Sequence, residues 1–282
     1  MDYMQEYEKW LASPALTPEE HAELESICGD EKEIRERFYG PLEFGTAGLR
    51  GTMKVGLHQM NVHVIRWATQ GFANVICAEG EDARRRGVAL CMDCRNHSME
   101  FARAAAEVCA ANGIHVRIFE SLRPTPELSF AVREYGCQAG INVTASHNPK
   151  EYNGYKVYWE DGAQLPPHHA AAIAAELEKI DIFTGVKRMD FDEAVKAGLI
   201  ETMGDETDRQ TDLRTVTVTT AITVRAVTVR IIVTTVDRTS VARAVTTVTT
   251  ETAIVTIVRV VTDRVTVRAD RMVTEEIGRA HV

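Results

Sequence analysis

The sequence lacks any apolar run long enough to cross a bilayer, and Met1 to Trp10 is charged and polar, unlike a signal peptide. It also lacks an excess of basic residues, since the formal net charge is −9 over 282 residues. An acidic protein repels the phosphates of nucleic acids and of anionic membranes. We therefore expect a cytoplasmic protein that binds neither nucleic acid nor membrane.

The six cysteines lack the dense spacing of a small disulfide-bonded domain. Cys91 and Cys94 form a C-x-x-C pattern, but a second pair at zinc-site spacing is absent. Because Cys91 falls inside an expected strand, we interpret the two as unpaired, reduced thiols, with a redox or zinc site as the alternative. A Gly-x-Ser-x-Gly elbow is absent too, which argues against a serine hydrolase.

The segment 211–282 lacks Lys, Asn, Gln, Pro, Cys, Phe, Tyr and Trp, and its first glycine is Gly278. Thr, Val and Arg dominate it, and a β-rich domain would need turn residues about every 8–12 positions. We interpret this low-complexity tail as a sequence artefact to which no fold is assigned. The reading frame would be lost near Arg209, and 275–282 looks like a translated sequencing adaptor. A genuine repetitive tail is the alternative.

The rest of the chain alternates helical and strand patterns. Thr17 to Glu20 is a capping box within an N-terminal stretch of short helices, and Arg84 to Arg86 reads as a solvated loop. A strand–helix–strand–helix–strand order then predicts an α/β fold with a mostly parallel or mixed sheet between helices. The expected elements are helices at 1–40, 61–76, 99–111, 125–135 and from Pro166, and strands at 87–92, 114–119, 139–143 and 154–160.

A polar loop, Thr144 to Pro149, directly follows the expected buried strand 139–143. Ligands of α/β sheets bind beyond the carboxyl ends of the strands, which is where Ser146 would lie. Pro149 fixes its own φ and disfavours helix at Asn148, so the loop should be stiff. A merely polar Ser-His pair in a loop is the alternative. A second polar group, Asp93 to Asn96, ends the strand 87–92.

Phe44 to Gly51 contains three glycines, which let the backbone approach a ligand closely, and Arg50, whose planar fork suits a phosphate. A plain tight turn with a solvated arginine is the alternative. Tyr152 to Lys156 returns from the serine loop and would bring a cation back to it. A solvent-facing lysine on an alternating strand is the alternative for Lys156.

These motifs together resemble the α-D-phosphohexomutases, the phosphoglucomutases and phosphomannomutases. The match is strongest to the branch of type 2 phosphoglucomutases and phosphopentomutases. The resemblance covers residues 1 to about 210 and implies only the first of the family's four domains. It divides the chain into an N-terminal helical arm at 1–40, domain I at 41–204 and the start of an inter-domain segment at 205–210, before the tail at 211–282.

The resemblance implies a phosphosugar mutase that moves a phosphoryl group between positions 1 and 6 (or 5) of a hexose or pentose phosphate. Ser146 would be the phosphoserine and, through its phosphate, a ligand of Mg²⁺. A sugar bisphosphate would be the intermediate and activator. His147 and Lys156 would be general acid/base or charge-stabilising groups, and Arg50 would act on the phosphoryl group. Substrate or phosphate binding would involve Thr46, Arg50, Arg95 and Asn148.

The sequence departs from the family in three places. The Asp-x-Asp-x-Asp metal loop, the Gly-Glu-x-x-Gly sugar loop and the Arg-x-Ser-Gly-Thr phosphate loop are missing. Mg²⁺ prefers several oxygen ligands, so a serine phosphate alone cannot hold it. We therefore expect a fragment that is inactive by itself as a mutase, and the alternative is a non-catalytic fragment that only binds.

Overall fold

The computed structural model describes residues 2–46 and 48–217, together with four short strands farther along the chain. The chain divides into two compact units, Met1–Asp208 and Arg209–Val282. In the second unit β7 (Thr223–Val224) pairs antiparallel with β8 (Val227–Thr228), and β9 (Arg243–Val245) pairs antiparallel with β10 (Ile257–Arg259). The interpretation of 211–282 as a sequence artefact concerns residues that lie mostly outside the described part.

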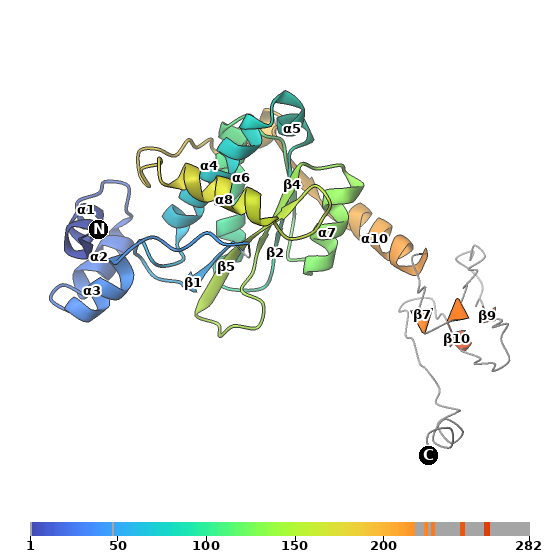
Figure 1. Cartoon of the computed structure of the whole chain (residues 1–282), viewed down its shortest axis with the longest axis horizontal. Coiled ribbons are helices and arrows are strands. Elements are labelled where there is room, and N and C mark those ends of the chain that lie inside the picture. Colours follow the sequence, from blue (N-terminus) through green and yellow to red (C-terminus); the bar gives the residue numbers. More distant parts are fainter. Residues whose placement is uncertain are drawn as a thin grey trace, which may run out of the picture. The chain divides into compact units, whose positions relative to one another are not determined.

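A six-stranded sheet forms the centre of the first unit (Figure 1). Its strand order is β1-β5-β4-β2-β3-β6. β4, β2, β3 and β6 run parallel, whereas β5 runs antiparallel to both of its neighbours, β4 and β1. The expected mixed sheet is confirmed. The strands are β1 (Leu49–Thr52), β2 (Val88–Met92), β3 (Val116–Phe119), β4 (Ala139–Val143), β5 (Tyr152–Trp159) and β6 (Ile200–Met203).

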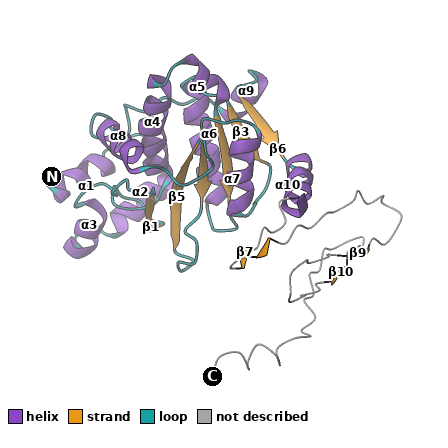
Figure 2. Cartoon of the chain, turned by 45° about the vertical axis from the view of Figure 1, so that its right-hand side comes forward, coloured by secondary structure: helices purple, strands orange, loops and turns teal. Residues whose placement is uncertain are grey.

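Helices cover both faces of this sheet (Figure 2). α4 and α6 pack against each other on one face, α8 packs on α4, and α7 packs on β2 and β4 from the other face. β2 and β4 are buried at every position because both of their faces are covered. The helices of this layer are α4 (Val62–Ala78), α6 (Ser98–Ala111), α7 (Thr125–Glu134) and α8 (Pro167–Leu177).

Besides β1, four elements differ from the sequence expectation. The arginine triplet is not a solvated loop but the end of α5 (Glu81–Arg86), where Arg84 pairs with Glu81 at 2.6 Å and Arg86 pairs with Glu160 at 2.9 Å. Acidic residues one turn earlier stabilise this short helix. The polar stretch after residue 180 contains α9 (Phe191–Lys196) and the edge strand β6, and α10 (Asp205–Thr217) follows.

The N-terminal helices α1 (Tyr3–Leu11), α2 (Pro18–Ser26) and α3 (Glu31–Phe38) belong to the same compact unit as the sheet. Both hydrogen bonds of the expected capping box at Thr17 are present. Trp10 is fully buried, with its ring centroid 5.7 Å from Phe38 and 5.0 Å from Phe183. These helices are therefore packed onto the segment that follows α8.

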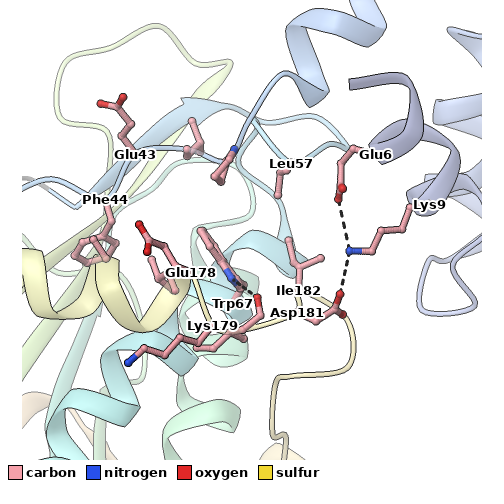
Figure 3. A pocket seen from close by; sticks show the side chains of 15 residues that line it. Glu6, Lys9, Glu43, Phe44, Leu57, Trp67, Glu178, Lys179, Asp181 and Ile182 are labelled. Carbon is pink, nitrogen blue, oxygen red and sulfur yellow. Dashed lines mark hydrogen bonds and ion pairs between the residues drawn. The ribbon is translucent and has the colours of Figure 1, made fainter. Parts of the chain in front are cut away.

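A cavity of about 760 Å³ lies between α1 and the end of α8 (Figure 3). At its rim the Lys9 ammonium lies 2.9 Å from an Asp181 carboxylate oxygen and 3.8 Å from one of Glu6. Trp67 lines it and donates from Nε1 to the carbonyl of Ile180 at 3.1 Å. The described residues around this cavity include none of the expected site residues.

In the described part of the chain, no helix has the length and apolarity needed to cross a membrane.

The edge strand β1 depends on a glycine, and Gly48→Ala tests this dependence. Gly48 has φ +76°, and a Cβ placed there would lie 1.8 Å from the carbonyl oxygen of Tyr155 on β5. We expect the free energy of unfolding to fall by about 3 kcal/mol or more, because backbone must move to relieve the clash. Urea unfolding of the purified chain measures this loss.

Gly136→Ala is the matched control for Gly48→Ala. Gly136 also has a positive φ, +60°, but a Cβ placed there meets nothing within 4 Å. Its free energy of unfolding should fall by only about 1 kcal/mol, the cost of placing alanine in the left-handed region. Equal losses in the two variants would show that β1 does not approach β5 this closely.

Candidate active site

Ser146 lies on the exposed loop that leaves the carboxyl end of β4, as the sequence indicates. Its φ is +58°, in the left-handed region that costs a side-chain-bearing residue about 1–2 kcal/mol. The Ser146 N–H donates to Thr144 Oγ1 at 3.0 Å, and the Asn148 N–H donates to the carbonyl of Ala145 at 3.1 Å. Strained residues of this kind persist where their surroundings hold them, and they cluster at functional sites.

The serine hydroxyl has an imidazole beside it. Ser146 Oγ lies 3.3 Å from His147 Nδ1, and both side chains are exposed. In this arrangement the imidazole can accept the hydroxyl proton through Nδ1 when that nitrogen is unprotonated. The structure thus brings Ser146 and His147 together, while the activation of the hydroxyl by His147 stays a prediction.

The glycine-rich segment meets the serine loop through Arg50. Its Nη1 donates to Asn148 Oδ1 at 3.0 Å, across 98 residues of sequence. Thr46 is exposed in the turn between Gly45 and Gly48, whose backbones hydrogen-bond each other at 2.8 and 3.2 Å. The structure thus brings Arg50 and Asn148 together, while the phosphate-binding roles of Thr46, Arg50 and Asn148 stay predictions.

Lys156 lies on β5 and shares a sheet face with Arg50. Arg50 pairs with Gly154 in the β1–β5 register, and Lys156 is two residues farther along the same strand. Its partner on β4 is Asn142, whose buried Oδ1 has no hydrogen-bond partner among the described residues. Lys156 is half-buried and makes no side-chain hydrogen bond or ion pair within the described part of the chain. Its ammonium is available to a ligand, but its catalytic role stays a prediction.

Arg95 lies against the backbone of the serine loop. Nη1 donates to the carbonyls of Pro149 and Tyr152, each at 2.9 Å. Nη2 donates to the carbonyls of Ser146 at 2.9 Å and Asn148 at 2.7 Å. The structure therefore places Arg95 beside the serine loop, while the expected contact of Arg95 with substrate or phosphate stays a prediction.

Three polar residues that the sequence analysis did not assign to the site form a hydrogen-bonded network that holds Arg95 and thereby the loop. Asp93 Oδ1 accepts hydrogen bonds from the Arg95 N–H and from Ser98 Oγ, both at 3.0 Å. The fully buried Asn153 donates from Nδ2 to Ser98 Oγ at 3.0 Å and accepts the Gly154 N–H at 2.8 Å. The polar group Asp93 to Asn96 at the end of the strand 87–92 was the sequence signal for part of this network, whereas Asn153 precedes the expected strand 154–160 and carried no such signal.

Cys91 and Cys94 are free thiols, as expected. Burial raises the pKa of the Cys91 thiol to about 12, so it is not a thiolate near neutral pH. The described residues contain no group of three or more His, Cys, Asp or Glu side chains that could hold a metal ion. The described part of the chain therefore does not fit a Mg²⁺ site, because a serine phosphate would supply one ligand where Mg²⁺ needs several.

Residues 41–182, just over half of the chain, match the family model described as phosphoglucomutase/phosphomannomutase, alpha/beta/alpha domain I. The chain belongs to the phosphoglucomutase/phosphomannomutase family. The matched region contains the glycine-rich segment, Arg95, the serine loop and Lys156. The expected family and fold class are both confirmed.

The chain is similar to two curated relatives and to one solved structure. A phosphopentomutase of Mus musculus is 40% identical over 177 residues, which cover 61% of this chain and 28% of that protein. A phosphoglucomutase of Staphylococcus saprophyticus is 39% identical over 176 residues, which cover 62% of this chain and 31% of that protein. A phosphoglucomutase/phosphomannomutase family structure from Burkholderia thailandensis is 22% identical, with a TM-score of 0.47. The alignment covers 62% of this chain and 35% of that one. The chain thus spans about a third or less of the length of these proteins.

The left-handed conformation of Ser146 gives a prediction that needs no activity. Ser146→Gly should exceed Ser146→Ala in free energy of unfolding by about 0.5–1 kcal/mol, because glycine adopts φ +58° without steric cost. Both variants lose the hydroxyl, so they differ chiefly in backbone preference. Guanidinium unfolding measures the difference. If the alanine variant is equally stable or more stable, Ser146 does not keep its positive φ in solution.

Proposed function

We propose that this chain carries the phosphoserine domain of a phosphosugar mutase. Ser146 would exchange a phosphoryl group with positions 1 and 6 (or 5) of a hexose or pentose phosphate, by way of a sugar bisphosphate. One observation supports this most: the exposed, strained Ser146 lies at the carboxyl end of β4 with His147 Nδ1 at 3.3 Å. The names of the relatives, phosphopentomutase and phosphoglucomutase, support both substrate classes.

The chemistry follows from the groups around the hydroxyl. When a sugar bisphosphate loads the enzyme, Ser146 Oγ forms a bond to phosphorus while the bond from phosphorus to the sugar oxygen breaks. His147 takes the hydroxyl proton, and the departing sugar oxygen gains one from a general acid, a role that suits Lys156. Arg50 would place positive charge near the equatorial phosphoryl oxygens, which carry the developing charge in such transfers. The reverse step returns the phosphoryl group to the other position of the sugar.

Phosphoryl uptake separates the mutase proposal from a fragment that only binds. We expect the purified chain, incubated with glucose 1,6-bisphosphate, to gain one phosphoryl group, and peptide mass spectrometry should place it on Ser146. Ser146→Ala should abolish the gain, whereas Ser121→Ala, at another exposed serine, should leave it unchanged. A chain that binds the bisphosphate, as seen by calorimetry, but never becomes phosphorylated would support the binding-only alternative.

We propose further that this chain alone does not complete the mutase cycle. It covers less than a third of the length of two mutases it resembles, and its described residues offer no metal-binding cluster. A coupled assay with glucose 1-phosphate or ribose 1-phosphate should therefore show no multiple turnover, with or without added Mg²⁺. A turnover rate near that of a full-length mutase would contradict this proposal.

A further inference from the structure

We propose that Arg95 is a positioning residue, one that fixes the shape of the serine loop and does not bind the sugar phosphate itself. The starting point is the four hydrogen bonds from its guanidinium to loop carbonyls. The proposal deepens the proposed function, and it rests on that function in taking Ser146 as the nucleophile.

Every N–H group of the Arg95 side chain faces a protein acceptor. An arginine side chain has five N–H groups, of which the two nitrogens Nη1 and Nη2 carry four. Each of these nitrogens donates to two carbonyls of the loop, so all four N–H groups are accounted for. The fifth, on Nε, faces Asp93 Oδ2 at 3.4 Å. A phosphate could bind Arg95 only by displacing one of these partners, and the side chain is only 12% exposed.

The positions of the acceptors explain why this matters for the nucleophile. One of the four carbonyls belongs to Ser146 itself. The direction of a carbonyl is set by the ψ angle of its residue, so Arg95 fixes ψ at the residue whose φ is already strained. The other three carbonyls belong to Asn148, Pro149 and Tyr152, which brackets the loop as far as the start of β5. One planar cation thus holds both ends of the segment that presents the hydroxyl.

Arg95 is itself held by rigid elements. The Asp93 carboxylate, at the end of β2, faces its Nε and accepts its backbone N–H. Asp93 also accepts the hydroxyl of Ser98 on α6, which in turn accepts the Asn153 amide on β5. Ser98 and Asn153 are almost completely buried. The loop is therefore tied through Arg95 to two strands and a helix, which is how supporting residues confer precision on a site.

Lysine cannot replace arginine in this role. Its ammonium has three donors and no planar fork, so it cannot meet four carbonyls at once. Arg95→Lys consequently distinguishes the proposed positioning from a simple need for positive charge. Arg117→Ala is the matched control, because Arg117 is also partly buried, pairs with Glu201 at 2.6 Å and donates to the carbonyl of Arg86 at 3.2 Å, away from the serine loop.

Hydrogen exchange of the full chain, followed by mass spectrometry in phosphate-free buffer, tests the proposal. In Arg95→Ala the amides of residues 146–152 should exchange at least about tenfold faster than in the wild type, since several charge-assisted hydrogen bonds are lost. Arg95→Lys should recover little of this protection, and Arg117→Ala should leave it unchanged. Added guanidinium ion, but not ammonium, should restore protection to Arg95→Ala. If Arg95→Ala does not fold, Arg95→Lys carries the test, because it keeps the charge and most of the stem.

Three results would overturn the proposal. The first is loop exchange in Arg95→Ala within twofold of the wild type, or in Arg95→Lys when the alanine variant does not fold. The second is full protection in Arg95→Lys, which would show that any cation suffices. The third is a wild-type loop that becomes protected only when inorganic phosphate is added, which would make Arg95 a phosphate ligand. These measurements need no phosphoryl transfer, so a chain that fails to phosphorylate Ser146 would overturn the proposed function and leave this result intact.

Discussion

The antiparallel pairing of β5 with both β4 and β1 is the constraint on which the site depends. β5 lies between the strand that ends in the serine loop and the strand that carries Arg50. Its Gly154 carbonyl accepts the Thr144 N–H at 3.0 Å, and a Cβ on Gly154 would lie 2.6 Å from the Thr144 carbonyl oxygen. Only a residue without a side chain allows the loop to start this close to the sheet. The same strand then carries Lys156, so the two pairings of β5 bring the distant glycine-rich segment to the serine loop and Lys156.

The site combines a strained serine with a rigid support. The left-handed Ser146 would relax in a loose loop, because its penalty is comparable with the strength of a single hydrogen bond. The structure opposes this relaxation with bonds inside the loop and with a buried polar network beneath it. Local strain with such compensation is what functional sites show when the rest of a fold obeys ordinary rules.

The sequence was informative where burial or strand ends determine position. The serine loop could be placed because apolar runs and helices alternate before it, and a parallel sheet then puts Ser146 beyond a carboxyl end. The four residues of β1 could not be recognised, because they hold a glycine and two polar residues, and their strand exists only through its pairing with β5. The helix at Arg84 to Arg86 was missed because charge suggested solvent, while its stability comes from ion pairs one turn apart. The partners of Arg95 were beyond prediction, since backbone carbonyls are the same in every residue and leave no trace in a sequence.

The two arginines near Ser146 differ in how many of their N–H groups already have a protein acceptor, a difference that the sequence does not reveal. Arg50 is exposed and its one hydrogen bond in the described part of the chain goes to Asn148, so most of its N–H groups can meet a phosphoryl group. Arg95 is nearly buried, and protein acceptors face all of its N–H groups. A cation that stabilises developing charge must be free to approach it, whereas a cation that defines backbone shape must be fully engaged beforehand. Arg50 meets the first requirement and Arg95 the second, which agrees with the proposal that Arg50 on β1, and not Arg95 after β2, would bring positive charge to a phosphoryl group.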